Sequence, residues 1–357
     1  MKTYYKFILN TFLKSFIFVF FVMLSLVIIL NILSEIEFFR NTNVNFLFPL
    51  YLSLLNSPAL IFEMFPFIFL ISTQLFFINL FNDNQIQIFK YSGLKNSKIL
   101  TIISFFTFFL GILIIIIFYS FSSNLKNFYL ELKNNYTADD EYLAVVTKNG
   151  LWIKDNVDGK VSIINASKID NNYLINTFIT QFDNEYEVLN NIQADKIDIS
   201  NNNWLAYQVK LYKNNQSEKK KIFTIKSNFN YEKIQSLFSN LSSLSILKLL
   251  DLRNNYLSLN YSIIEVDLEL NRIISYPIYL SLMTILSAIL MFNIKRFNST
   301  TIKIALGLFL SVVIYYLNNF FYVMGKTEKF DVSVAIWTPL LAILILNLTM
   351  IFKINEK

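Results

Sequence analysis

Long apolar runs occupy both ends of the chain, and short polar segments separate them. The runs contain at most one charged residue each, and each is long enough to cross about 30 Å of hydrocarbon as a helix. The six predicted spans are Ser15–Ser34, Pro58–Leu80, Ile99–Leu125, Ile273–Ile294, Ile304–Gly325 and Val332–Phe352. The pattern therefore predicts a polytopic α-helical membrane protein with six transmembrane helices, arranged three before and three after a polar middle.

The middle of the chain has short alternating segments and frequent charges. Turn signals such as Asn149-Gly150 and Asp158-Gly159 separate segments that fit half-buried strands. These segments are Tyr142–Lys148, Leu151–Lys154, Lys160–Ile164, Leu174–Phe182, Lys196–Ser200, Trp204–Tyr212 and Lys221–Ser227. Regular short strands are typical of an antiparallel sandwich or jelly roll, and Ser236–Leu259 then has a helical pattern. We predict an inserted all-β, jelly-roll-like domain with a helical return segment over residues 126–267, between helical regions at 1–125 and 268–357.

Basic residues cluster at the segments that we place in the cytoplasm. They are Lys2, Lys6, Lys14, Lys90, Lys95, Lys98, Lys295, Arg296 and Lys303. The positive-inside bias then puts both termini inside and the central domain outside. A cleaved signal peptide is a poor alternative, because the first apolar run is long and no small-residue cleavage site follows it.

The polar stretch Asn82–Lys98 separates the second and third spans and is too short to be a domain. At helical spacing, Ile86, Phe89 and Gly93 fall on one face, with Ile88 to the side. Gly93 suits a helix stop, because glycine adopts left-handed dihedrals at little cost. We interpret the stretch as a short cytoplasmic helix that a soluble partner binds. A solvated loop is the alternative.

The composition excludes several kinds of chemistry. The 357 residues are 54% hydrophobic and include neither cysteine nor histidine. Disulfides, thiolate nucleophiles, Ser-His-Asp triads and histidine zinc sites are therefore excluded. The net charge of +6 fits lysine-rich cytoplasmic loops better than nucleic-acid binding. We expect no catalytic residue, no metal and no nucleic-acid partner.

Nucleotide and ion motifs are also poor matches. The closest approach to a phosphate-binding loop is Gly325-Lys326-Thr327, but Phe320 stands where that motif needs its first glycine. The acidic triplet Asp139–Glu141 fits a solvated turn better than an ion cage. We expect no cofactor, so any energy for work must come from another protein.

Polar side chains at or inside the spans are the remaining candidates for a binding site. Glu35 and Glu37 end the first span, and such acids commonly lie at the interface. Glu63 in the second span is the better candidate for a buried charge. The segment Tyr315–Phe321 places Asn318 and Asn319 in mid-span, where amides need partners. For each of these, lipid-facing or helix-packing roles are the alternative.

Five short motifs carry a resemblance to a known family. They are Ser57-Pro58 followed by Phe65-Pro66, Asn84–Lys95 with Ser92-Gly93, Gly150–Asp155, Arg272–Pro277 and Trp337-Thr338-Pro339. In order and spacing they resemble lipopolysaccharide export permeases of the LptF/LptG (YjgP/YjgQ) family, nearer LptG, over nearly the whole chain. Gly150–Asp155, GLWIKD, is the most specific.

The resemblance implies a permease subunit of the inner membrane. Such a subunit pairs with a second homologous permease and a cytoplasmic ABC ATPase dimer, which uses the ATP. The pair extracts lipopolysaccharide from the membrane and passes it to a periplasmic bridge protein through the outer domains. The resemblance also implies that the ATPase binds a coupling helix, whose residues here are Asp83, Gln85, Ile86, Phe89, Lys90, Ser92 and Gly93.

The chain departs from the family at two places. Gln85 stands where the family usually has glutamate, and Asp83 is the candidate substitute. Basic residues near the outer end of the first span are few, since Asn31 falls near one such position and Arg40 is the only basic residue. The candidate lining of the lipid cavity is then Asn31, Glu35, Arg40, Glu63, Tyr315, Asn318 and Asn319.

Two other functions remain open. A membrane-anchored sensor or adaptor would bind a ligand through the outer β domain and recruit a partner through the stretch Asn82–Lys98. An enzyme acting on lipid-linked sugars would need a metal, with Glu35 and Glu37, or Asp139–Glu141, as its carboxylates. Co-purification of an ATPase whose turnover depends on this chain separates the transporter from the sensor. For the transporter, we expect Phe89→Asp or Gly93→Val to abolish coupling. Phe89 would be the largest apolar group on the exposed face of the helix, and a β-branched residue at position 93 would clash.

Overall fold

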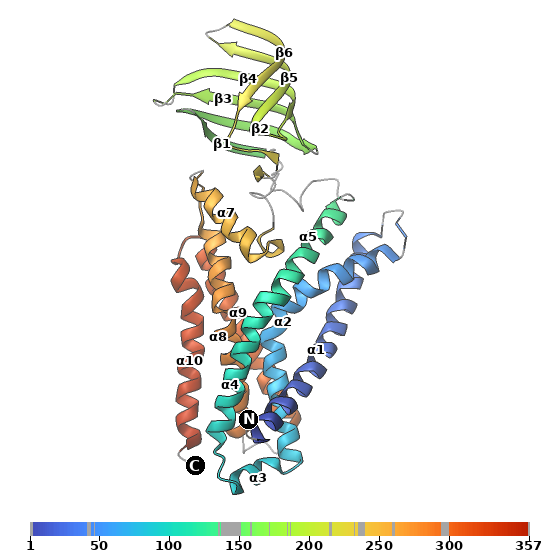
Figure 1. Ribbon diagram of the computed structural model, residues 1–357, viewed down its shortest axis with the longest axis vertical. Helices are drawn as coiled ribbons and strands as arrows, with labels where there is room; N and C mark the ends of the chain where they lie inside the picture. The colour runs from blue at the N-terminus through green and yellow to red at the C-terminus, as the bar shows by residue number, and fades with distance from the viewer. Residues whose placement is uncertain are drawn as a thin grey trace. The chain divides into compact units, whose positions relative to one another are not determined.

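The structure is a computed structural model that describes most of the chain. The described residues are 3–40, 44–45, 47–134, 136, 151–157, 159–170, 172–183, 185, 187–213, 216–231, 233–234, 240–258, 261–293 and 300–355. The chain divides into two compact units (Figure 1). A helical unit comprises Met1–Tyr129 and Ile264–Lys357, and a second unit comprises Leu130–Ile263.

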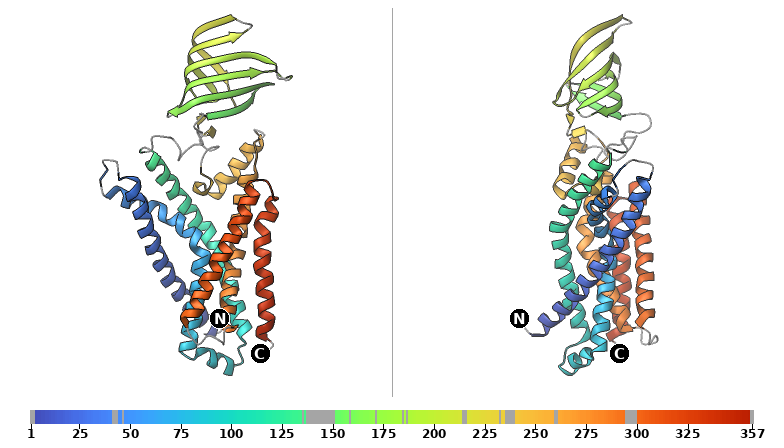
Figure 2. Two further views of the ribbon diagram at one scale, coloured as in Figure 1. Left: turned by 180° about the vertical axis from the view of Figure 1, so that it is seen from behind. Right: turned by 90° about the vertical axis from the view of Figure 1, so that its right-hand side faces the viewer.

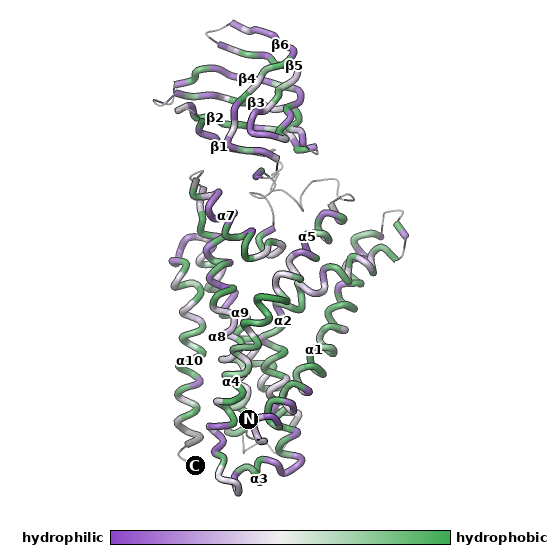
Figure 3. The backbone as a smooth tube through the Cα atoms, viewed as in Figure 1, coloured by the Kyte–Doolittle hydropathy of each residue, from purple (hydrophilic) through white to green (hydrophobic). Residues whose placement is uncertain are grey.

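The helical unit confirms the six predicted spans. Its helices are α1 (Thr3–Phe38), α2 (Leu47–Asn82), α3 (Gln85–Tyr91), α4 (Asn96–Leu113), α8 (Ile264–Asn293), α9 (Thr300–Lys326) and α10 (Val332–Asn355). Helix α4 continues through a π-helical segment, η1 (Ile114–Tyr119), into α5 (Ser120–Asn134). Among the described residues, six helices are long and apolar enough to cross a membrane. Figure 3 shows apolar residues along them and polar residues around α3.

Several helices extend beyond the predicted spans. Helix α1 begins at Thr3, α2 begins at Leu47, and the third span continues through α5 past Lys126. Helix α8 begins at Ile264, so its first turns carry charged residues. A run of apolar residues marks only the part of a helix that lies in the hydrocarbon of the membrane. Charged side chains at helix ends reach the interface and do not stop the helix.

Helices α2 and α8 form the centre of the helical unit. Of their most apolar windows, 67% and 78% of residues are buried, against 17% for both α1 and α9. Gly111 allows α4 to pack closely on α8, since a Cβ there would lie 3.0 Å from the Pro277 Cα atom. Helices α1 and α9 therefore leave broad apolar faces exposed in the isolated chain.

The second unit contains one antiparallel sheet. Its strands are β1 (Leu151–Val157), β2 (Lys160–Asp170), β3 (Tyr173–Phe182), β4 (Val188–Asp198), β5 (Asn203–Lys213) and β6 (Gln216–Lys226). A 3-10 turn, η2 (Leu241–Ser243), and α7 (Ile246–Ser258) follow. The all-β prediction is confirmed, and six of the seven predicted segments fall on these strands; Tyr142–Lys148 lies outside the described residues.

The described strands follow one another in sequence order across the sheet (Figure 2). Each pairs with its neighbour in the chain, so the connection pattern is an up-and-down meander. A jelly roll requires pairs between strands that are distant in sequence. Among the described strands there is no such pair, and the jelly-roll form is therefore not confirmed.

The first strand of the sheet is anchored by a buried carboxylate. Asp155 lies on the inward face of β1 and is 2% exposed. It accepts hydrogen bonds from Ser227 Oγ at 2.7 Å, from the Asn228 amide nitrogen at 3.1 Å and from Asn228 Nδ2 at 2.9 Å. These bonds hold the start of the sheet to the segment after β6. The final aspartate of GLWIKD is therefore a structural residue.

We expect Asp155→Ala to destabilise the β unit by about 3 kcal/mol, because it leaves buried donors without their charged acceptor. The measurement is urea unfolding of the full-length chain in detergent, followed by tryptophan fluorescence in a Trp337→Phe background. Asp195→Ala is the matched control, since Asp195 is exposed on β4. Equal unfolding curves for the two variants would contradict the anchoring role.

Candidate functional site

The polar stretch between the second and third spans forms a short helix. Helix α3 spans Gln85–Tyr91 and begins after Asn84, which has a left-handed φ of 52°. Gly93 follows the helix with a φ of +77°, as predicted for a glycine stop. Gln85 Nε2 donates to Asp83 Oδ2 at 3.2 Å, so the residue that departs from the family pattern contacts its candidate substitute. Asp83, Lys90 and Ser92 are exposed.

The outward face of α3 differs from the predicted one. Ile86 is 5% exposed, and Phe89 is half-buried with its ring 6.0 Å from that of Phe7 on α1. Ile88 and Tyr91 are instead 59% and 90% exposed. The interpretation of Phe89 as the largest outward apolar group is therefore wrong. Ile86 and Phe89 do share a face, but that face packs against the chain itself.

The expected clash of Gly93→Val is also corrected. A Cβ built on Gly93 meets no atom within 4 Å among the described residues. The cost of a side chain comes from the left-handed backbone, which is least favourable for a β-branched residue.

Two predicted cavity residues hold helices together. Asn31 Nδ2 donates to the Ser53 carbonyl at 3.1 Å and joins α1 to α2. Glu35, which is 1% exposed, accepts a hydrogen bond from the Tyr129 hydroxyl of α5 at 2.7 Å. Arg40 lies in the exposed turn after α1. Asn31, Glu35 and Arg40 are not among the residues that line the polar cavity described next.

The other four predicted residues line one cavity between α2, α8, α9 and α10. Its volume is about 240 Å³. The residues around it are Phe62, Glu63, Pro66, Arg272, Ser275, Tyr276, Tyr279, Tyr315, Asn318, Asn319, Tyr322, Ala335, Ile336 and Leu340. The structure thus brings Glu63 to the segment Tyr315–Asn319, across a sequence separation of about 250 residues, and adds a half-buried arginine and further tyrosines that were not predicted. Glu63 itself is exposed in the isolated chain, so the expectation of a buried charge at this position is wrong. We call this cavity the polar cavity.

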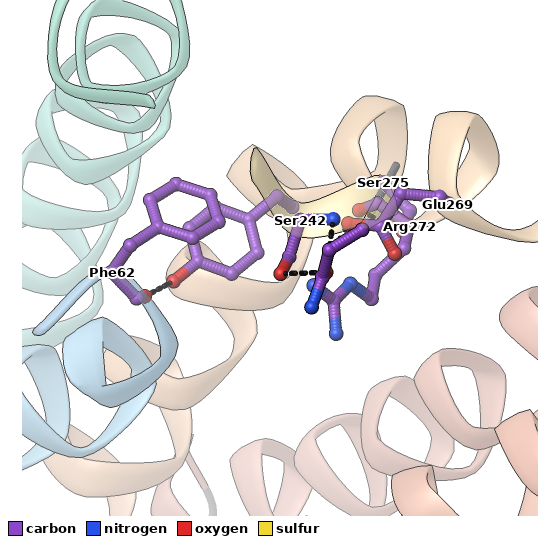
Figure 4. A network of polar contacts seen from close by, with 7 residues as sticks. Phe62, Ser242, Glu269, Arg272 and Ser275 are labelled. Carbon is purple, nitrogen blue, oxygen red and sulfur yellow. Dashed lines mark hydrogen bonds and ion pairs between the residues drawn. The ribbon is translucent and has the colours of Figure 1, made fainter. Parts of the chain in front are cut away.

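An ion pair on α8 supplies the positive charge of the polar cavity (Figure 4). Arg272 Nη2 lies 2.9 Å from Glu269 Oε1, and Glu269 is 3% exposed. The Arg272 guanidinium also lies over the Tyr322 ring, 5.8 Å from its centroid. The sequence interpretation treated Arg272 only as the start of a motif. The i,i+3 spacing of Glu269 and Arg272 just before an apolar run is the signal that identifies them.

Neighbouring contacts fix the wall of the polar cavity. The Tyr276 hydroxyl donates to the Phe62 carbonyl and joins α8 to α2. Ser275 Oγ donates to the Arg272 carbonyl at 3.1 Å. Figure 4 shows Phe62 on α2 facing the α8 residues. Residue 66 is a proline and has no amide hydrogen. The Phe62 carbonyl therefore does not accept the usual helical hydrogen bond from the residue four positions later. The tyrosine hydroxyl replaces that bond.

The stretch that partly matched a phosphate-binding loop packs as a helix end. Gly325 lies in the last turn of α9, and a Cβ there would be 2.6 Å from Ala335 Cβ and 2.9 Å from Leu268 Cδ2. The glycine therefore allows α8, α9 and α10 to approach one another.

The polar side chains that line the polar cavity can form hydrogen bonds with a polar group at the level of the spans.

The whole-chain comparison agrees with this architecture. The family model described as lipopolysaccharide export system permease LptF/LptG matches residues 6–353. No curated protein matches the chain. Because the match covers both helical regions and the sheet between them, the chain belongs to the LptF/LptG family of lipopolysaccharide export permeases and is a multi-pass transport subunit of the inner membrane.

Proposed function

We propose that this chain is the LptG-type subunit of an ABC exporter that extracts lipopolysaccharide from the inner membrane. A separate cytoplasmic ATPase dimer supplies the energy, and a periplasmic bridge protein accepts the lipid from the β unit. The GLWIKD segment, Gly150–Asp155, favours LptG over LptF. In this proposal the termini and α3 are cytoplasmic and the β unit is periplasmic.

The exposed face of α3 is the observation that carries the proposal. Tyr91 is 90% exposed and Ile88 is 59% exposed on a seven-residue helix between two spans. Exposed tyrosine is enriched at the centres of protein interfaces. Helix α1 begins and α10 ends at the end of the helical unit where α3 lies (Figures 1 and 2). That end fits an ATPase-binding side.

The faces of α1 and α9 support a second permease. Phe18 and Phe21 on α1 are 63% and 62% exposed, and Phe309 and Tyr316 on α9 are 65% and 66% exposed. Both helices have the least buried windows of the described spans. A homologous subunit packed against them would enclose a path for the lipid. A membrane-anchored sensor would also use an exposed α3 to recruit a partner, but it does not need these apolar faces of α1 and α9.

The test is lipid release by the reconstituted complex. The chain is co-expressed with its genomic partners, purified in nanodiscs that contain labelled lipopolysaccharide, and mixed with a soluble periplasmic acceptor. We expect ATP-dependent transfer of label to the acceptor and none with a hydrolysis-deficient ATPase. An ATPase that neither co-purifies nor changes its turnover with this chain would favour the sensor.

A further inference from the structure

The charges around the polar cavity balance one another. Glu63 and Arg272 line it, and Glu269 pairs with Arg272. The Lys126 ammonium interacts electrostatically with both Glu63 and Glu269. Two carboxylates therefore face two cations. A phosphate would approach Glu63 with a like charge, and an ammonium would approach Arg272 with a like charge. The balance favours an uncharged polar occupant.

Two polar groups of the polar cavity make no hydrogen bond of ordinary geometry with the described residues. The enclosed Nδ2 atom of Asn318 is one of them, although the side chain lies beside the Tyr279 hydroxyl. The structure shows no hydrogen bond or ion pair within 4 Å for the Glu63 carboxylate in the part of the chain that it describes. The enclosed Asn318 amide needs an acceptor, and the exposed Glu63 carboxylate can accept from a donor. Hydroxyl groups provide both.

The shape and aromatic lining limit the size of the occupant. A volume of about 240 Å³ is below the range of about 300–1,000 Å³ that is typical of sites for drug-sized ligands. The rings of Tyr279, Tyr315 and Tyr322 contribute broad apolar faces beside the polar groups. A single sugar ring, with apolar C–H faces and hydroxyl edges, matches this lining.

We propose that the polar cavity binds one hydroxyl-bearing sugar unit of a glycolipid headgroup and does not bind its phosphate. The inference rests on the proposed function only in that the transported lipid is a glycolipid. Glu63 accepts from a sugar hydroxyl, Asn318 donates to one, and the Arg272–Glu269 pair keeps the cavity neutral. The site therefore selects for carbohydrate and leaves phosphate recognition to other residues.

Binding of two simple lipids to the full chain tests this assignment. The probes are monoglucosyl diacylglycerol and phosphatidic acid with the same acyl chains, titrated into phosphatidylcholine nanodiscs and measured by native mass spectrometry. We expect Asn318→Leu and Glu63→Leu each to weaken glucosyl-lipid binding about fivefold, which is the value of one hydrogen bond. Phosphatidic acid binding should stay within twofold in Asn318→Leu and should rise in Glu63→Leu, which removes a repulsive charge. Tyr316→Phe, on the outer face of the same helix, is the matched control.

Glu63→Gln keeps the shape of the side chain and guards against misfolding of the leucine variants. We expect it to retain most glucosyl-lipid binding and to raise phosphatidic acid binding, because a repulsive charge is removed. Preferential binding of phosphatidic acid by the unmodified chain overturns the proposal. If the unmodified chain binds the glucosyl lipid but its reconstituted complex releases no lipopolysaccharide, the exporter function is refuted and the sugar site remains.

Discussion

Arg272→Leu should destabilise the helical unit by about 3 kcal/mol. Glu269 is 3% exposed and forms an ion pair with Arg272 at 2.9 Å. Removal of the guanidinium leaves a buried carboxylate without its contacting ion-pair partner, which is costlier than losing both charges together. Unfolding of the purified chain by sodium dodecyl sulfate, followed by the circular dichroism of its helices, measures the change.

The double variant Arg272→Leu/Glu269→Leu separates charge from packing. We expect it to regain most of the lost stability, since both charges are then absent. Arg272→Lys keeps the positive charge but lacks the planar fork of the guanidinium. Its stability should lie between those of Arg272→Leu and the unmodified chain. Equal destabilisation by the single and double variants would show that the pair does not act as a unit.

The six spans and the sheet follow from local patterns. Charge-free runs of about 20 residues form helices in a membrane, because a helix satisfies the hydrogen-bonding groups of its own backbone. Alternation in the middle region predicted strands because one face of each strand is buried, as the pattern of Leu151, Ile153 and Asp155 on β1 shows. Such signals are contained within one element, so they need no knowledge of its neighbours.

The packing direction of α3 did not follow from the sequence. Periodicity places Ile86 and Phe89 on one face of a helix but does not tell whether that face meets the chain or a partner. The contact of Phe89 with Phe7 joins residues far apart in sequence. Tyr91 is outward for the same reason, because the two helices fix the rotation of α3.

The candidate lining residues show the same limit. Glu63 and Asn318 line the polar cavity, while Glu35 bonds to Tyr129 and Asn31 bonds to Ser53. All four are polar residues in apolar helices, and the sequence alone gives each the same meaning. Their roles separate only when tertiary contacts decide which of them have partners within the chain.

Tyr91→Asp should reduce co-purification of the ATPase about tenfold while leaving the amount of membrane-inserted chain unchanged. Tyr91 is 90% exposed, so the substitution costs the isolated chain little, but it puts a charge into the centre of the proposed interface. A loss of about 1.4 kcal/mol corresponds to that factor. Ile88→Asp should act in the same direction. Pull-down from detergent-solubilised membranes, normalised to the chain, gives the ratio.

The controls distinguish surface recognition from the position of α3. Asn82→Asp puts the same charge at the exposed end of α2, outside the Ile88–Tyr91 face, and should keep ATPase binding. Phe89→Asp should lower binding by separating α3 from α1, and protease cleavage near α3 should increase with it, unlike with Tyr91→Asp. Gly93→Val should have a smaller effect through its left-handed backbone. If Tyr91→Asp binds the ATPase as the unmodified chain does, while Phe89→Asp does not, the partner contacts another face of α3.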